Sequence, residues 1–314
     1  MALGATETDL GQQQVGAFAD RVRAIRTALH EVVVGQDEVI DQLLVCALTG
    51  SHALIVGVPG LAKTLMVKAL AAAFRWKYGR IQFTPDLMPA DVTGYELLSR
   101  GEDGQGPAMT FRPGPVFANL VLADEINRAA PKTQSALLEA MAERHVTVGG
   151  KTYPLPEAQL DRVMMEIRIG YPTPAQEEEI VLRTTAGMPE LPQASLDREE
   201  FLQLRDLVLA VPVANNVAGY AVRLCGASRP EDARSGKFVR DYVAWGAGPR
   251  GSQNLVLAAK ARALLMGRAA PTAEDVRASA LPILRHRIIV NHRAVGDSIT
   301  SAEVIGRLLE EVAV

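Results

Sequence analysis

A short apolar run that leads into a glycine-rich turn is the feature that most constrains this chain. Residues 52–56 read HALIV, and residues 57–64 read GVPGLAKT. An apolar run of this length is typical of a strand buried on both faces of a parallel sheet. A helix that opens at Lys63 and Thr64 would point its free backbone N–H groups at an anion. The pattern therefore predicts a strand, a phosphate-binding turn and a helix in succession.

The turn carries two side chains suited to a nucleotide. Lys63 would reach the β- and γ-phosphates, and the Thr64 hydroxyl would ligate magnesium. The usual pattern has glycine just before the lysine, whereas this chain has Ala62, whose Cβ must be accommodated. The alternative is an incidental Gly/Pro turn with a surface lysine, which the strand–turn–helix context disfavours. The candidate nucleotide-binding residues here are Gly57, Val58, Pro59, Gly60, Leu61, Ala62, Lys63, Thr64 and Leu65.

A pair of acidic residues forms the second candidate half of the site. The apolar segment LVLA at residues 120–123 ends in Asp124 and Glu125. An aspartate at the tip of a buried strand is suited to hold magnesium, and the next glutamate can act as the base that polarises an attacking water. Alone, the pair could equally be a solvated loop or the N-cap of the next helix. Together with the glycine-rich turn it predicts a magnesium site shared by Thr64 and Asp124.

Strand-like and helix-like segments alternate in the first half of the chain. Further strands are expected at 80–84, 119–123 and 163–169, and helices at 15–32, 38–48, 63–74 and 131–144. This alternation predicts an α/β fold, a P-loop αβα sandwich with a parallel sheet. Residues 93–115, rich in Gly and Pro, are expected to form a long loop or a hairpin excursion.

The second half of the chain shows helical spacing throughout. Helices are expected at 199–210, 215–226, 252–267, 273–284 and 301–313, the fourth opened by a capping box at 272–275. A proline-punctuated linker at 171–192, with a short acidic helix around 177–182, precedes them. We therefore expect a nucleotide-binding domain at 1–190 and an all-α domain at 191–314.

Composition limits the other classes of function. The 33 Lys and Arg residues against 36 Asp and Glu give a net charge of −3, which does not favour nucleic acid or an anionic membrane as partner. Cys46 and Cys225, the two cysteines, lie in apolar stretches and are expected to be buried thiols. No basic and apolar leader is visible at the N-terminus and no uncharged run reaches about 18 apolar residues, so a cytoplasmic location is expected.

A basic cluster follows the helix expected at 273–284. It consists of Arg285, His286, Arg287, His292 and Arg293. We interpret it as a solvated surface next to a helix end, and a contact with an acidic partner or nucleic acid is the alternative.

Several longer segments follow one another along the chain: GVPGLAKT, IQFTPDLMPAD, FRPGPVFANLVLADEINRA, PKTQSALLEAMAER and EAQLDR. Taken in this order, they resemble MoxR-type AAA+ ATPases, relatives of the magnesium chelatase motor subunit. The resemblance runs from about Val34 to the C-terminus and is dense up to residue 172. It implies an αβα nucleotide-binding domain, a helical lid, ATP and Mg²⁺ as cofactors, and a ring, typically a hexamer, with the ATP site shared between neighbours.

The same resemblance assigns further residues. Arg162 in LDR looks like the arginine finger that acts on the next subunit's γ-phosphate, and Arg250 in GPR looks like the lid arginine called sensor 2. Val34, Gly35 and Gln36 resemble the stretch that lies against the adenine. From the residues alone, either arginine is an ordinary surface cation.

The chain departs from the family pattern after residue 148. In the family, an apolar strand that ends in the polar sensor-1 residue precedes EAQLDR, whereas here VTVGGKTYPLP runs straight into it. No strand of adequate length fits between Val148 and Asp161, because Lys151 to Pro156 contains two prolines. The missing strand would lie mid-sheet, between the strand before the turn and the strand ending at Asp124. We therefore expect a slot or a makeshift filler there, and weakened ATP turnover.

Two hypotheses for function follow. The first is an ATP-hydrolysing, ring-forming chaperone that remodels a partner protein, by resemblance one with a von Willebrand A domain. The second is a nucleotide-binding scaffold or defective paralogue that hydrolyses little ATP because sensor 1 is absent. A DNA-associated motor is disfavoured by the charge balance.

Overall fold

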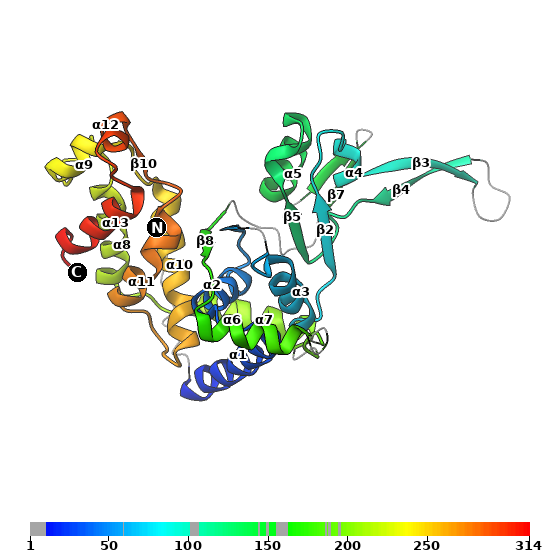
Figure 1. Ribbon diagram of the computed structural model, residues 1–314, viewed down its shortest axis with the longest axis horizontal. Helices are drawn as coiled ribbons and strands as arrows, with labels where there is room; N and C mark the ends of the chain where they lie inside the picture. Colours follow the sequence, from blue (N-terminus) through cyan, green and yellow to red (C-terminus); the bar gives the residue numbers. More distant parts are fainter. Residues whose placement is uncertain are drawn as a thin grey trace, which may run out of the picture.

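The computed structural model describes residues 11–58, 60–100, 107–143, 145–148, 151–154, 163–185, 187, 190–193 and 196–314. The first part of the chain, up to α6, alternates strands with helices, as the sequence predicts (Figure 1). Its elements are α1 (Gln12–Val32), α2 (Asp37–Leu48), β1 (Ala53–Gly57), α3 (Lys63–Ala73), β2 (Tyr78–Gln82), α4 (Pro89–Thr93), β3 (Gly94–Arg100), β4 (Pro107–Pro113), β5 (Leu120–Asp124), η2 (Ile126–Arg128), α5 (Pro131–Glu143), β6 (His145–Val148), β7 (Lys151–Pro154), β8 (Met165–Ile169) and α6 (Pro174–Thr185).

The remaining part is mostly helical. Its elements are α7 (Arg198–Ala210), α8 (Asn215–Ala227), α9 (Lys237–Tyr242), β9 (Val243–Trp245), α10 (Pro249–Leu265), α11 (Ala273–Leu284), β10 (Ile289–Val290), α12 (His292–Gly296) and α13 (Ser301–Glu311). The expected capping box is present at the start of α11, where the Asp275 carboxylate accepts the Thr272 backbone N–H at 2.8 Å. The prediction that this part is all-α was wrong in one detail, because β9 and β10 form a short antiparallel pair. Sequence patterning misses strands of two or three residues because they are too short to show alternation.

The parallel sheet is split into two halves. β1 pairs with β8, from Ala53 opposite Met165 to Gly57 opposite Ile169. β2 pairs with β5, from Tyr78 opposite Leu120 to Gln82 opposite Asp124. Among the described residues no strand joins β1 to β5, so each half-sheet has two strands. No strand of adequate length was expected between Val148 and Asp161, yet the short strand β7 (Lys151–Pro154) lies there and pairs with β6, not with β1 or β5. Residues 155–162 lie outside the described part of the chain, so the expected loss of the sensor-1 strand stays a prediction.

The strands beside the interruption are less buried than the sequence predicts. HALIV was expected to be buried on both faces, yet Leu54 and Val56 in β1 are 41% and 42% exposed. All five residues of β5 are only half-buried. An apolar strand reaches full burial only when layers and neighbouring strands cover it, and no described strand covers the inner edge of β1 or of β5. The prediction of two-sided burial was therefore wrong, and the split of the sheet is the reason.

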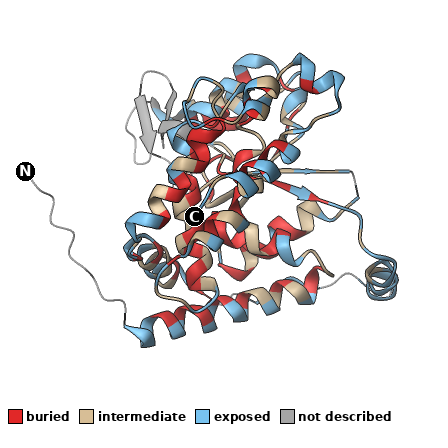
Figure 2. Cartoon of the chain, turned by 90° about the vertical axis from the view of Figure 1, so that its left-hand side faces the viewer, coloured by how far each residue is buried: buried red, intermediate tan, exposed pale blue. Residues whose placement is uncertain are grey.

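The N-terminal helices and the C-terminal helices share one hydrophobic core. α10 is packed against α8 and α11 and also against α1 and α2. The buried face of α1 carries Val15, Phe18, Val22, Ile25 and Leu29, the positions that its helical spacing predicts. Figure 2 shows how buried and exposed residues are distributed over the chain.

The two cysteines lie in this core, as expected. Both thiols are buried and free. Burial raises the pKa of Cys46 to about 12 and also raises the pKa of Cys225, so neither is a reactive thiolate at neutral pH.

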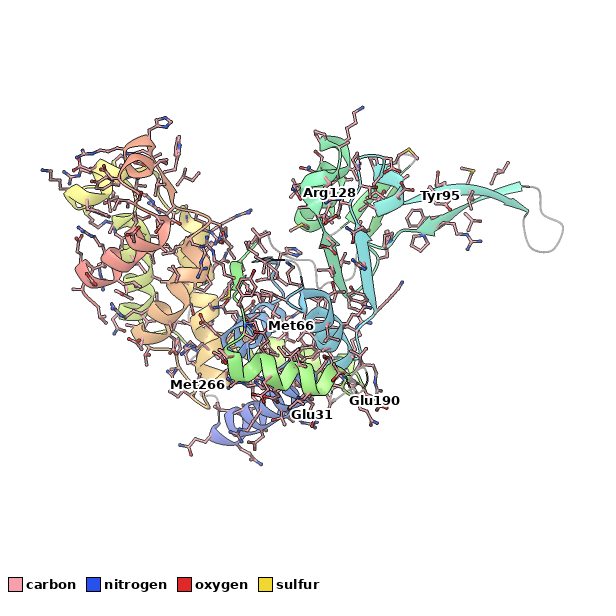
Figure 3. The ribbon with its side chains drawn as sticks, in the orientation of Figure 1. Glu31, Met66, Tyr95, Arg128, Glu190 and Met266 are labelled. Atoms are coloured by element: carbon pink, nitrogen blue, oxygen red, sulfur yellow. The ribbon has the colours of Figure 1, made fainter. Side chains whose placement is uncertain are left out.

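The excursion expected at 93–115 is a long antiparallel hairpin. β3 and β4 pair from Gly94 opposite Pro113 to Arg100 opposite Pro107, and the hairpin projects from the body of the molecule (Figure 1). Tyr95, which is 48% exposed, lies on it (Figure 3). At its base Phe111 packs edge-on against Phe117 with ring centroids 5.4 Å apart, which ties the hairpin to the loop before β5.

No single helix in the described part of the chain has the length and apolar character needed to cross a membrane. α7 and α8 meet that test only as a pair, and they are bent by 86° at their junction.

Candidate functional site

The glycine-rich turn joins β1 to α3 as the sequence predicts. β1 ends at Gly57 and α3 begins at Lys63. Gly60 has φ +88°, and an added Cβ there would meet no atom within 4 Å. The inner side of the turn is thus open at this glycine. Pro59 lies outside the described residues.

Ala62 shows why glycine is the usual residue before the lysine. It lies in the left-handed region, with φ 52° and ψ 20°, directly before the first residue of α3. A residue with a Cβ costs roughly 1 kcal/mol more than glycine in this conformation. The turn therefore keeps the backbone that a glycine would favour, with a modest local strain.

Lys63 is held by the turn itself. Its Nζ donates to the carbonyl oxygen of Gly57 at 2.6 Å and to that of Val58 at 3.1 Å. Both acceptors are neutral backbone carbonyl groups, so these two hydrogen bonds do not neutralise the positive charge of the ammonium group. An anion seated in the turn would find this charge available.

The acidic pair lies at the end of β5, as expected, but β2 contacts it. Arg80 Nη2 is 2.9 Å from Asp124 Oδ2, and Gln82 Nε2 donates to Glu125 Oε2 at 2.8 Å. Arg128, one turn further along, forms an ion pair with Glu125 at 3.3 Å. Both carboxylates are therefore engaged by cationic or amide donors.

Sequence reasoning missed Arg80 and Gln82. The signal was present, because the two residues are separated by one position in a strand and therefore lie on the same face of β2. Their registry with β5, where Gln82 is opposite Asp124, was needed to place them beside the acids.

One large cavity brings the turn and the acids together. Its volume is about 1260 Å³. Its lining includes, from the turn, α3, the end of β5 and the residues that follow it, Gly60, Leu61, Ala62, Lys63, Thr64, Leu65, Asp124, Glu125 and Asn127. The Thr64 hydroxyl and the Asp124 carboxylate are oxygen donors of the kind that Mg²⁺ prefers, and Lys63 supplies a cation for phosphate. The residues present therefore fit a nucleotide and its magnesium.

Other predicted site residues, among them Gly57 and Val58 of the turn, are not among the residues that line this cavity. Val34, Gly35 and Gln36 do not line it. Gln36 Nε2 donates to Gly170 O at 3.1 Å, and Gly35, at φ +65°, would clash with Gln176 if it carried a Cβ. This stretch therefore packs where β8 meets α6.

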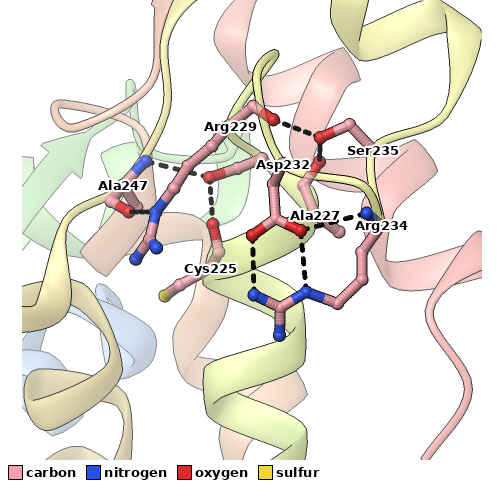
Figure 4. A network of polar contacts seen from close by, with 8 residues as sticks. Cys225, Ala227, Arg229, Asp232, Arg234, Ser235 and Ala247 are labelled. Atoms are coloured by element: carbon pink, nitrogen blue, oxygen red, sulfur yellow. Dashed lines mark hydrogen bonds and ion pairs between the residues drawn. The ribbon is translucent and has the colours of Figure 1, made fainter.

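Arg250 is exposed in the first turn of α10 and also does not line the cavity. A network of polar contacts fixes the residues before it (Figure 4). Ser228 Oγ accepts the Ala247 backbone N–H at 2.9 Å, and Arg229 Nε donates to Ala247 O at 2.8 Å. In the same loop Asp232 accepts three hydrogen bonds from Arg234, which hold the pKa of its carboxyl far below the usual range.

Arg162 lies outside the described residues, but the strand that follows it is anchored. Arg287 donates through Nη2 to Val163 O at 2.8 Å and through Nη1 to Met164 O at 3.0 Å. Beside it, burial lowers the pKa of His286 to about 4, and the Arg287 charge contributes. The interpretation of this cluster as a solvated surface was therefore wrong for these two residues. Arg287 joins the end of α11 to the residues before β8, and His286 is partly buried beside it.

Comparison with known proteins gives two family matches. Residues 52–158 match the ATPase family associated with various cellular activities (AAA), and residues 237–308 match the AAA lid domain. The chain is 38% identical to Chaperone MoxR1 of Mycobacterium tuberculosis, over 94% of this chain and 84% of that protein. It is 33% identical to Protein MoxR of Paracoccus denitrificans, over 86% and 89%. A crystal structure of a candidate ATPase from Cytophaga hutchinsonii superposes with a TM-score of 0.87 at 34% identity, over 96% of this chain and 97% of the other.

The alignment with Chaperone MoxR1 is longer than the chain. It extends over 320 positions, and these include 94% of the 314 residues of this chain. That relative therefore has residues that stand opposite gaps in this chain.

Proposed function

The chain belongs to the MoxR family of chaperone-like AAA+ ATPases, and we propose that it binds ATP with Mg²⁺ in the cavity beside α3 and hydrolyses it. The observation that carries this proposal is that Lys63, Thr64, Asp124 and Glu125 line one cavity although β1 and β5 belong to separate half-sheets.

Each of these residues has a defined part. Lys63 binds the β- and γ-phosphates, and Thr64 and Asp124 hold the metal through oxygen atoms. Bound magnesium neutralises charge on the phosphates. Glu125 acts as the general base and accepts the proton of the attacking water at a carboxylate oxygen. For this to happen, the Gln82 amide that donates to Glu125 must leave one carboxylate oxygen available.

The assembly is proposed on family grounds. We propose a ring, typically a hexamer, in which Arg162 of one subunit completes the site of the next and Arg250 contributes from the lid. The nucleotide-binding domain would comprise residues 1–190 and the lid residues 191–314, with Val34, Gly35 and Gln36 beside the adenine. The protein partner would carry a von Willebrand A domain, and the location would be cytoplasmic.

A second candidate function is a nucleotide-binding scaffold with slow turnover. Two observations favour it: the sheet is interrupted between β1 and β5, and Arg80 forms an ion pair with Asp124, the proposed metal ligand. Hydrolysis requires the turn and the acids to be held at a fixed separation, and no described strand bridges them.

Two measurements on the same preparation separate the candidates. A titration with a fluorescent ATP analogue gives the affinity, and steady-state phosphate release gives the turnover. Binding with turnover at least about tenfold above that of a Glu125→Gln variant supports the enzyme. Binding with equal turnover in the two proteins supports the scaffold, and absence of binding contradicts both.

A further inference from the structure

The described residues form two separate hydrophobic cores. One core contains side chains of α1, α2, α3 and β8 together with the C-terminal helices. The other consists of buried residues between Ile81 and Ala140, from β2, α4, α5 and the loops beside them. Figure 1 shows α4, α5, β2 and β5 standing to one side of the rest of the chain.

Each core belongs to one half of the candidate site. We call the described residues of 11–76 and 163–314 the phosphate body, because they carry the turn with Lys63 and Thr64. We call the described residues of 77–154 the acid body, because they carry Asp124 and Glu125. The cavity that these four residues line therefore lies between two bodies, each with a core of its own.

The chain passes from one body to the other between Trp76 and Lys77. The Trp76 ring is stacked on Phe74 with centroids 4.6 Å apart and packs edge-on against Phe201 at 4.7 Å, so it is fixed in the phosphate body. The Lys77 N–H donates to Asn119 Oδ1 at 2.9 Å, and the Lys77 carbonyl oxygen accepts the Asn119 N–H at 2.9 Å. Lys77 is thus already fixed in the acid body, and the junction is very short.

The two bodies also touch beside this junction. Leu120, the first residue of β5, packs against the core of the phosphate body, and α3 contacts β5. Asp124 is at the other end of the same strand, about 13 Å from Leu120. A rotation of about 10° around an axis near the junction would move Asp124 by about 2 Å and Leu120 very little.

The backbone before the junction is suited to a change of conformation. Arg75 has φ +51°, which lies in the left-handed region. Strain of this kind in a residue other than glycine is concentrated at functional and switch segments. The junction is therefore a candidate hinge.

The charged groups of the site are held within their own bodies. The Lys63 ammonium donates to backbone carbonyl oxygens of the phosphate body. Side chains of the acid body contact both Asp124 and Glu125. Among the described residues no ion pair joins Lys63 to either acid, although the three side chains line one cavity. Opposite charges at contact distance would attract strongly in a cavity, so the lack of pairing indicates that the two halves stand apart.

We propose that the acid body closes onto the phosphate body when MgATP binds, by rotation at residues 75–77. This inference rests on the proposed binding of MgATP, in which Lys63 holds the phosphates and Thr64 and Asp124 share the metal. A ligand that contacts both bodies binds the closed arrangement better than the open one and shifts the population toward it. The nucleotide then joins β1 and β5, between which no described strand makes a connection.

The distance between the two bodies tests the proposal. Spin labels at Tyr171→Cys, beyond the end of β8, and Lys132→Cys, in the first turn of α5, lie on the two sides of the site, and both positions are exposed. The native Cys46 and Cys225 are buried, so the labels go to the introduced thiols. Addition of the ATP analogue AMP-PNP with Mg²⁺ is expected to shorten the mean distance by at least about 3 Å. An unchanged distance at saturating nucleotide overturns the proposal.

A second pair of labels is the matched control. Tyr171→Cys and Glu310→Cys both lie in the phosphate body, and the C-terminal helices share its core. We expect the distance between these labels to stay constant when AMP-PNP and Mg²⁺ are added. A change confined to this pair would mean that the C-terminal helices move and the acid body does not, which contradicts the proposal.

The role of the shared metal is tested by leaving it out. Without Mg²⁺, Lys63 can still bind the phosphates, but Thr64 and Asp124 have no ion to share. AMP-PNP bound under this condition is expected to leave the distance between Tyr171→Cys and Lys132→Cys unchanged. Competition with a fluorescent nucleotide measures binding in the same samples. Binding in Mg²⁺ without shortening overturns the closure and leaves the proposed ATP binding intact, whereas absence of binding contradicts both.

Two cores also predict two steps of unfolding. The tryptophans, Trp76 and Trp245, both lie in the phosphate body, so their fluorescence follows that body, whereas far-UV circular dichroism follows both bodies. We expect the two urea transitions to differ without nucleotide and to coincide when AMP-PNP and Mg²⁺ are bound, because coincident probes indicate one cooperative unit. Coincident transitions in the absence of nucleotide would contradict the division into two bodies.

Discussion

The Arg80 guanidinium on β2 lies 2.9 Å from a carboxylate oxygen of Asp124 at the end of β5. The ion pair is partly exposed, with 45% of the Arg80 side chain and 30% of the Asp124 side chain accessible. Asp124 is also a proposed magnesium ligand, so the cation of Arg80 and a metal ion compete for the same carboxylate.

Replacing Arg80 should therefore strengthen metal-dependent nucleotide binding. Partly exposed ion pairs are worth about 0–1 kcal/mol, so Arg80→Gln is expected to raise the affinity for MgATP by up to about fivefold. The control is Arg168→Gln, which breaks a comparable pair with Glu166 at 2.8 Å on β8. Titration with a fluorescent nucleotide in the presence and absence of Mg²⁺ measures the effect. A fall in affinity in Arg80→Gln alone would show that Arg80 supports the site.

Lys63 should be essential for nucleotide binding. Lys63→Ala removes the cation that faces the phosphate-binding turn and is expected to lower ATP affinity at least tenfold, because ion-assisted hydrogen bonds to phosphate are strong. Lys68→Ala, an exposed lysine of the same helix, is the matched control and should bind normally. Unchanged ATP affinity in Lys63→Ala, measured by the same titration, would show that the turn at residues 57–64 does not bind the phosphates.

The left-handed conformation of Ala62 gives a stability prediction. Ala62→Gly relieves a positive φ of 52° and is expected to stabilise the chain by up to about 1 kcal/mol. Ala72→Gly, inside the same helix, should destabilise by about 0.5–1 kcal/mol because glycine is less favourable in a right-handed helix. Urea denaturation of the two variants checks the opposite signs. Changes of the same sign would mean that the left-handed turn is not present in solution.

Glu125 and Arg162 should act on opposite sides of a shared site. Glu125→Gln is expected to bind MgATP and to lower turnover at least tenfold, and Arg162→Ala should also lower turnover. Mixing the two variants should restore part of the activity, since some interfaces then combine an intact base with an intact arginine. Phosphate release from the mixture, compared with each variant alone, measures this. No gain on mixing at any ratio contradicts completion between subunits.

His286 predicts a loss of stability in mild acid. Burial and the neighbouring Arg287 charge lower its pKa from 6.5 to about 4 in the folded chain, so between these values the unfolded chain binds more protons than the folded one. The contribution of His286 to stability is complete above pH 6.5, declines as the pH falls to about 4, and is constant below that. Urea midpoints across this range should show a steeper fall for the wild type than for His286→Gln, which has no proton to bind. Parallel curves would show that His286 is solvated.

The local parts of this protein follow from its sequence alone. The alternation of the longer strands and helices, the turn at residues 57–64, the acids at the end of β5 and the capping box of α11 all follow from patterns within a few residues. Such features depend on backbone propensity, short-range hydrogen bonds and the spacing of apolar side chains. An interruption of the sheet was also expected from the sequence, although the segment after Val148 does form a short strand, β7, which pairs with β6.

Which side chains contact one another depends on the tertiary structure. The pairing of β2 with β5 places Arg80 and Gln82 beside the acids, and the packing of α11 on β8 buries His286 and engages Arg287 with backbone carbonyls. The exposure of Leu54 and Val56 likewise depends on a neighbouring strand that is lacking among the described residues. These contacts join residues far apart in the chain, and their energies depend on registry and layer packing, which no local pattern encodes.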